Sequence, residues 1–166
     1  MDGILDGRGY TVANFTITGN GLFAHVAETG GFRNIQFVNV TKTSASGILA
    51  HMMYGTVENV YIKAMVQSDA NNGNILCYGG GATTIIRNVI MDITATNVTH
   101  WILGQNWAAV PATLDNVHVY QNGTSSLHGV ATGALDFAWT NSDVYSSVAD
   151  LINATKHFGA PWIVED

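Results

Sequence analysis

The stretch Val57-Glu58-Asn59-Val60-Tyr61-Ile62 decides the fold, because its pattern returns along the chain. In each copy, the second residue before an Asn and the first and third residues after it are apolar. The copies lie at 12–17, 32–37, 57–62, 86–91 and 114–119, and their asparagines are 20, 25, 29 and 28 residues apart. Return of one unit at a period of roughly 20–50 residues is typical of a solenoid.

A second apolar stretch follows every copy, so the whole unit repeats. These second stretches lie at 21–25, 46–51, 74–78, 101–105 and 129–133. Two strands per coil, joined by turns rich in Gly, Asn, Thr and Ser, favour an all-β fold in which each coil stacks on the last, about 4.8 Å away. We therefore predict a parallel β-helix of about five coils, right-handed as parallel crossovers usually are.

The repeated Asn is expected to form a ladder at a bend in each coil. A bend would let the apolar side chains on both sides of the Asn point inward. Stacked Asn side chains stabilise such columns by hydrogen bonding to one another. The predicted ladder consists of Asn14, Asn34, Asn59, Asn88 and Asn116.

The residue just before each Asn supports the same register. In order, this residue is Ala13, Arg33, Glu58, Arg87 and Asp115, so the charge alternates from the second coil onward. Stacking in register would place opposite charges side by side, and a slip by one coil would lose that pairing.

The C-terminal segment has a different period. Val144, Val148, Leu151 and Ile152 fall at helical spacing, and Ser142 can cap the start. We predict that residues 1–141 form the solenoid and that 142–166 form a helical cap and tail over the last coil. The N-terminus shows no comparable cap, so an edge of the first coil is expected to be exposed unless a preceding domain, a partner chain or trimerisation covers it.

Three N-terminal motifs can be compared with known repeats: Leu5-Asp6-Gly7-Arg8-Gly9-Tyr10-Thr11, the strand Gly21-Leu22-Phe23-Ala24 and the strand Phe32-Arg33-Asn34-Ile35. They resemble the GLUG repeat family. The resemblance covers residues 5–62, and Ala24 and Ala50 stand where the family pattern has a second glycine. It implies a parallel β-helix of the kind found in bacterial surface adhesins and in phage structural proteins, and it implies no shared catalytic residues.

Composition excludes several function classes. The formal net charge is −6 and charged residues make up 11% of the chain, without a basic patch, so nucleic-acid binding is not expected. The apolar runs are far shorter than a membrane span, and residues 1–20 show no secretory leader. Cys77 is the only cysteine, which excludes an internal disulfide.

Candidate metal and catalytic groups are sparse. His25 and His51 occupy equivalent places in successive coils, with Tyr78 next in that column, but no carboxylate or cysteine joins them to complete a metal site. Glu58 and Asp115 are the only acids in one column, and Arg87 between them would hold both ionised. We therefore predict no catalytic residue, no metal and no cofactor.

A stripe on the strand after each Asn is expected to face outward. It consists of Tyr61, Ile90 and Tyr120. Exposed apolar and aromatic side chains in a row indicate an interface, so we expect this stripe to contact neighbouring subunits.

Taken together, these features favour a rigid scaffold rather than an enzyme. The leading interpretation is a structural protein of a phage or virus particle, either a capsid decoration protein or a spike or fibre segment, forming a homotrimer with other particle proteins as partners and located in the virion. The alternative is a β-helical module of a larger bacterial surface adhesin, and cell-surface glycans are a further partner class. A polysaccharide-degrading spike enzyme with a site between subunits ranks third.

Overall fold

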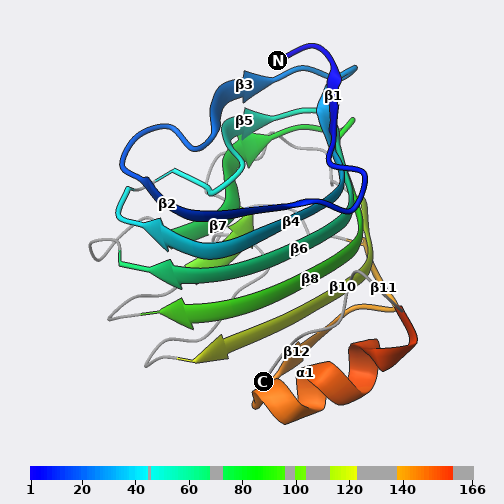
Figure 1. Cartoon of the computed structure of the whole chain (residues 1–166). Helices are drawn as coiled ribbons and strands as arrows, with labels where there is room; N and C mark the ends of the chain where they lie inside the picture. Colours follow the sequence, from blue (N-terminus) through cyan, green and yellow to red (C-terminus); the bar gives the residue numbers. More distant parts are fainter. Residues whose placement is uncertain (45, 68–72, 96–99, 104–112, 123–137, 159–166) are drawn as a thin grey trace.

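The computed structural model describes residues 1–44, 46–67, 73–95, 100–103, 113–122 and 138–158. It is a parallel β-solenoid of about four turns with a single short C-terminal helix (Figure 1). The predicted fold class is confirmed, with about four turns instead of about five. The expected strand at 129–133 and the tail at 159–166 lie outside the described residues.

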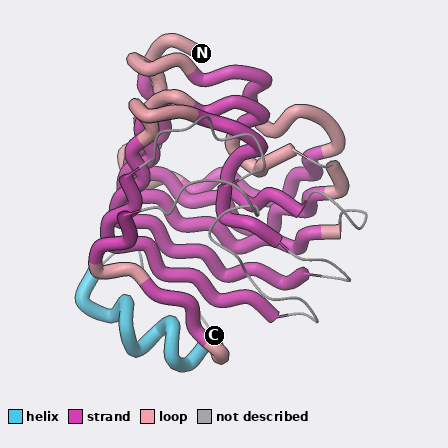
Figure 2. Tube along the Cα trace, turned by 180° about the vertical axis from the view of Figure 1, so that it is seen from behind, coloured by secondary structure: helices cyan, strands magenta, loops and turns pink. Residues whose placement is uncertain are grey.

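Two parallel sheets form the walls of the solenoid, as the view from behind also shows (Figure 2). The long-strand sheet contains β1 (Ile4–Asp6), β2 (Thr11–Ile17), β4 (Gly31–Lys42), β6 (Thr56–Val66), β8 (Ile85–Ala95), β10 (Thr113–Asn122), β11 (Ala138–Thr140) and β12 (Asp143–Tyr145). The short-strand sheet contains β3 (Phe23–Val26), β5 (Ala50–Met53), β7 (Gly73–Gly80) and β9 (His100–Leu103), in that order.

The core lies between the two sheets. It is built from inward-facing side chains that stack in columns from coil to coil. One column runs through Phe37, Ile62, Met91 and Val119, which are paired in register on β4, β6, β8 and β10. All four side chains are buried. Full burial of such a side chain contributes about 1.5–3 kcal/mol, so the stacked columns supply the main driving force for folding.

A left-handed residue divides each long strand into two arms. Asn34, Asn59, Asn88 and Asn116 have φ between 51° and 58°. Asn tolerates this conformation better than most residues, because its short polar side chain can hydrogen-bond locally. The turn in the backbone interrupts the two-residue alternation, which explains how the apolar residues before and after the Asn both point into the core.

The first coil departs from the predicted register. Asn14 pairs with the second arm of β4, where Ala13 lies opposite Val38 and Phe15 opposite Val40. Its side chain accepts a hydrogen bond from Asn39 Nδ2 at 3.1 Å, so the expectation that Asn14 stacks on Asn34 is wrong. The short separation of 20 residues between those two asparagines has this cause, because Asn39, not Asn34, is the residue one coil later.

A tight turn replaces the Asn bend in that first coil. Strand β1 pairs with the first arm of β4 and β2 pairs with the second, with Gly7 to Tyr10 between them. The amide of Tyr10 bonds to the carbonyl of Gly7 at 2.8 Å, and Gly9 has φ 84°. A Cβ at Gly7 would lie 2.4 Å from Ile35 Cβ, so only glycine fits there.

The C-terminal helix begins later than the predicted start at Ser142. Helix α1 (Val148–Thr155) continues into the 3₁₀ turn η1 (Lys156–Phe158). The N-cap is Ser147, whose Oγ accepts from the Asp150 amide, and not Ser142. Ser142 instead accepts a hydrogen bond from the Val117 amide at 2.9 Å, which ties the chain to β10 before the helix starts. The helix lies beside β10 and β12 at the end of the stack opposite the N-terminus (Figure 1).

Candidate functional site

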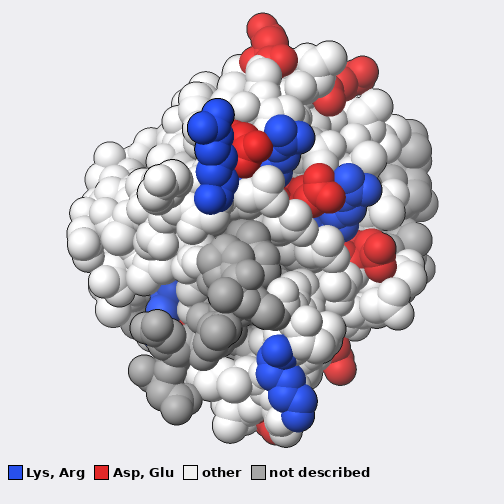
Figure 3. Space-filling view, turned by 45° about the vertical axis from the view of Figure 1, so that its right-hand side comes forward, with Lys and Arg blue, Asp and Glu red and all other residues white. Residues whose placement is uncertain are grey.

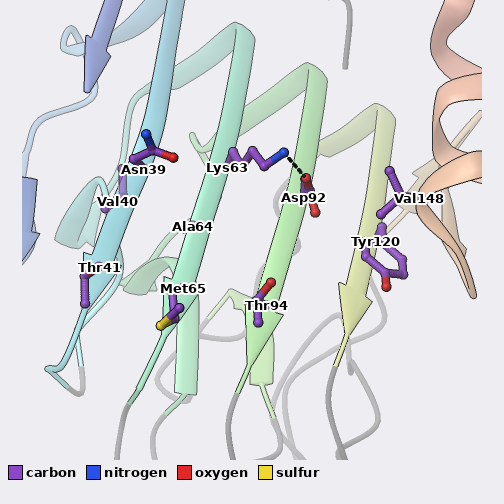
Figure 4. Close-up of a pocket in the computed structure, with 10 residues that line it drawn as sticks. All are labelled: Asn39, Val40, Thr41, Lys63, Ala64, Met65, Asp92, Thr94, Tyr120 and Val148. Carbon is purple, nitrogen blue, oxygen red and sulfur yellow. Dashed lines mark ion pairs between the residues drawn. The ribbon is translucent and has the colours of Figure 1, made fainter. Parts of the chain in front are cut away.

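A pocket lies on the outer face of the long-strand sheet (Figure 4). It lies on the second arms of the strands, beyond the Asn bend, and is closed on one side by the start of α1. Its volume of about 440 Å³ falls within the range of roughly 300–1,000 Å³ that is usual for ligand sites. The lining residues are Asn39, Val40, Thr41, Lys63, Ala64, Met65, Asp92, Thr94, Tyr120 and Val148. We call this site the outer pocket.

Strand register arranges the outer pocket in two rows. Lys63, Asp92 and Tyr120 are paired neighbours on β6, β8 and β10 and form the first row. Thr41, Met65 and Thr94 form the second row, two residues further along the strands. Neighbours within a row are about 4.8 Å apart because they lie on adjacent strands. The pocket is therefore lined mainly by two rows of side chains that cross neighbouring strands.

A single ion pair crosses the first row. Lys63 Nζ lies 3.4 Å from Asp92 Oδ2, and the exposed fractions of the two side chains are 41% and 7%. A carboxylate that is almost buried requires a partner of opposite charge, and Lys63 supplies it. Asp92 is the only carboxylate that lines the outer pocket. Glycoside hydrolysis ordinarily uses a pair of carboxylates, and this lining contains one.

Several polar side chains of the outer pocket have no protein partner. Among the described residues, the hydroxyl groups of Thr41, Thr94 and Tyr120 make no hydrogen bond, and Met65 beside them is exposed. Sequence reasoning missed this site. The available signal was the position four residues after Asn59, Asn88 and Asn116, which is occupied by Lys63, Asp92 and Tyr120, three polar side chains with no common chemistry.

The predicted Asn ladder is present in four of its five members. Each Nδ2 donates to the Oδ1 of the preceding coil at 2.9 Å, from Asn59 to Asn34, from Asn88 to Asn59 and from Asn116 to Asn88. In place of Asn14, Asp6 ends the ladder by accepting from Asn34 Nδ2 at 3.2 Å. Hydrogen bonds from the Arg8 amide and from Asn34 hold the pKa of Asp6 below its usual value.

The charge column beside the ladder also begins at Asp6. Register places Asp6, Arg33, Glu58, Arg87 and Asp115 in one row, and the alternation of acidic and basic side chains is visible in Figure 3. Arg33 Nε lies 3.0 Å from Asp6, and Arg87 Nε lies 2.8 Å from Glu58. The hydrogen bond and charge of Glu58 raise the pKa of Arg87, and Asp115 adds to this effect. These carboxylates are held as structural counter-ions.

The predicted column of His25, His51 and Tyr78 forms only in part, because His51 lies opposite Tyr78 whereas His25 is offset. His25 pairs with Met52, one residue beyond His51, and its ring lies against Tyr54 with the centroids 5.3 Å apart. His51 stacks on Tyr78 at 4.6 Å, and its Nδ1 is 2.9 Å from Ser46 Oγ. A register shift of one residue between β3 and β5 is the reason for the separation. Within the described residues, no three His, Cys, Asp or Glu side chains are grouped as metal ligands would be.

The expected subunit interface is covered by the chain itself. Tyr61 and Ile90 do point outward from the sheet, but they are only 4% and 1% exposed because they pack in one cluster with Leu151 of α1. The expectation that they form an exposed stripe is therefore wrong. Tyr120 is partly buried at the edge of the same cluster and lines the outer pocket.

His118 joins the Asn ladder to the C-terminal segment. Its Nε2 lies 2.8 Å from Asn116 Oδ1, and its Nδ1 lies 2.7 Å from the Tyr145 hydroxyl. An amide oxygen can only accept, so Nε2 carries the proton and Nδ1 accepts from Tyr145. Burial lowers the pKa of His118, His157 lowers it further, and Asp143 opposes the shift. The side chain is neutral in this arrangement.

A buried lysine lies on the inner side of the same arm that carries the outer pocket. Lys42 is paired with Ile17 and Val66, which are inward-facing, and burial lowers its pKa to about 8. Its Nζ donates to the carbonyl oxygen of Ser44, and the nearby Ser44 Oγ is buried without a partner among the described residues. The second arm thus carries polar side chains on both of its faces.

Comparison with known proteins returned no match to a family model, a curated protein or a solved structure. Of the helices in the described residues, none has the length and apolar character needed to cross a membrane.

Proposed function

We propose that this chain is a non-catalytic structural module of an assembled surface, of the GLUG-repeat type that residues 5–62 resemble. Its place would be a phage or virus particle, as a capsid decoration protein or a segment of a spike or fibre. The continuous Asn ladder and the alternating charge column support this proposal, because they hold successive coils in one register and favour a rigid rod.

The observation that carries the proposal is the uncovered first coil. Strands β1 and β3 are the last members of their sheets, so one backbone edge of each has no strand beside it in the described chain. Seven large hydrophobic side chains are exposed in the described part of the chain. Four of them belong to this coil: Ile4, Leu5, Tyr10 and Val12. An unpaired edge next to exposed apolar side chains is a surface that another chain can cover.

We propose that the covering partner is another copy of this chain in a homotrimer, or a neighbouring structural protein of the particle. The test is the solution mass of the purified chain by light scattering. A trimer near three times 17.7 kDa is expected. Val12→Lys should reduce the trimer, because it places a charge in the surface that becomes covered.

A matched control is available at the other end of the solenoid. Val12 and Val144 are both 43% exposed, but Val144 lies on β12. Val144→Lys is therefore expected to leave the mass unchanged. A wild-type chain that stays monomeric, or a trimer that both variants weaken equally, would overturn assembly through the first coil.

The adhesin alternative has support from the same observation. Further repeats placed before residue 1 would pair with β1 and β3 and bury their exposed apolar neighbours, as a preceding coil does elsewhere in the solenoid. A longer chain that contains such repeats and remains monomeric would favour this alternative. A spike enzyme has less support, because the outer pocket contains one carboxylate. Release of reducing ends from a polysaccharide would be needed to favour it.

A further inference from the structure

We propose that the outer pocket binds a neutral oligosaccharide. This inference goes beyond the structural role, and it holds whether or not the chain assembles. On this face of the sheet, some polar groups are paired within the chain and others are not. Along the Asn bend, each amide donates to the neighbouring coil. Only a few residues further along the same strands, the hydroxyl groups of Thr41, Thr94 and Tyr120 have no partner among the described residues.

The spacing of these groups matches a sugar better than a compact ligand. Neighbours within a row are about 4.8 Å apart, close to the width of a pyranose ring, so successive strands can contact successive parts of a ring or of a short chain. The lining residues come from four neighbouring strands and from α1 (Figure 4), and a site that extends across several strands suits an extended ligand. Hydroxyl groups of a sugar can both donate and accept, which is what threonine and tyrosine hydroxyls require.

The charges of the pocket favour a neutral ligand. Lys63 and Asp92 cancel each other at 3.4 Å, so the lining has no net charge. Lys63 is partly exposed and has three donors, of which its contact with Asp92 uses one, so it can also donate to a ligand hydroxyl. An acidic glycan would compete with Asp92 for Lys63 and would meet a chain with a net charge of −6.

Apolar contacts complete the match to a sugar. Met65 is exposed in the second row, and Val148 of α1 closes the end of the pocket beside Tyr120. Sugar rings have apolar C–H faces as well as hydroxyl edges, and mixed sites with a few placed polar groups bind such ligands. Because Val148 belongs to α1, the pocket is complete only when the C-terminal helix is docked.

The test is isothermal titration calorimetry of the full chain with maltohexaose, cellohexaose, xylohexaose and chitohexaose, and with a galacturonic acid hexamer as the acidic comparator. We expect at least one neutral oligosaccharide to bind at millimolar concentration or below, and the acidic hexamer to bind more weakly. Thr94→Val should weaken binding about tenfold, since it removes one hydrogen bond worth about 1–1.5 kcal/mol.

Two matched controls separate a local effect from a general one. Thr113→Val makes the same change at an exposed position of β10 outside the pocket, and it should leave binding unchanged. Met65→Ala should weaken binding, whereas Ile85→Ala, at an exposed apolar position of β8 before the bend, should not. Binding that the pocket variants and the control variants reduce equally, or no heat with any neutral oligosaccharide, overturns the proposal. The light-scattering mass of the same samples reports on assembly independently.

Discussion

The bend and the second arm of the long strands differ in how their polar groups are satisfied, although they are only a few residues apart. At the bend, Asn repeats in the four coils from Asn34 to Asn116, and the stack itself supplies the hydrogen-bond partners. On the second arm, the residue changes from coil to coil, from Lys63 to Asp92 to Tyr120. A repeated polar residue stabilises a solenoid, whereas a varied one leaves groups that can contact a ligand.

The largest loss of stability is expected at the bend. Asn88→Ala puts Ala at φ 53° and removes two ladder hydrogen bonds of 2.9 Å. Left-handed strain of about 1–2 kcal/mol and an unsatisfied neighbour together predict a loss of about 3 kcal/mol. Asn88→Gly keeps the backbone conformation accessible and should lose less. Urea unfolding measures both variants, and equal losses would show that backbone strain contributes nothing.

On the inner side of the second arm, we expect a substitution to increase stability. Lys42→Met should raise the unfolding free energy by about 3 kcal/mol at neutral pH, because the buried ammonium has a pKa of about 8 against 10.5 unfolded. Since the unfolded state binds more protons between these values, wild-type stability should rise from pH 8 to 10.5. The variant should lack this rise. A destabilised Lys42→Met would mean that the bond to Ser44 outweighs the burial of the charge.

A smaller loss of stability is expected in the outer pocket. Lys63→Met leaves Asp92 almost buried without its partner, and we expect a loss of about 2 kcal/mol in urea unfolding at neutral pH. Arg87→Met is the comparison at the bend, where Arg87 is half exposed and Glu58 can return to water, and it should cost about 1 kcal/mol or less. The reverse order would mean that the ion pair of the pocket contributes less than the charge column.

The smallest effect is expected where the ladder meets the C-terminal segment. His118 has a lowered pKa in the folded chain, so the unfolded state binds more protons below about pH 6.5. Stability should therefore fall as the pH drops from about 6.5 through the lowered pKa, with loss of the bond that Nδ1 accepts from Tyr145. Chemical unfolding at a series of pH values should show this slope reduced in His118→Gln and retained in His25→Gln, since the His25 side chain is exposed. Equal slopes in the two variants would contradict the role of His118.

Much of the fold could be predicted because it depends on local repetition. The spacing of Asn34, Asn59, Asn88 and Asn116 is enough to assign their columns, and the charges of Arg33, Glu58 and Arg87 agree with that register. Asn14 could not be placed in the same way. Its pairing depends on the turn at Gly7 to Tyr10, which shifts the first coil by five residues relative to the simple repeat.

The candidate site was harder to predict, because it depends on which surfaces the chain covers. Alternation places Tyr61 and Ile90 on the outer face of the sheet, but only the position of α1 shows that they are buried. His25 and His51 have equivalent places in the sequence, yet the pairing of β3 with β5 is offset by one residue. Because the coils differ in length, the sequence repeat does not reveal an offset of one residue.

The sequence by itself determined the parallel solenoid, its repeating unit and the Asn and charge columns. These features follow from the period at which one residue pattern returns, and each coil needs only its neighbours to form them. The tertiary structure alone decided the register of the first coil, the burial of Tyr61 and Ile90 under α1, and the outer pocket. These features arise where residues that are distant in the chain meet and no repeat relates them. Their formation therefore depends on packing contacts that no local sequence pattern predicts.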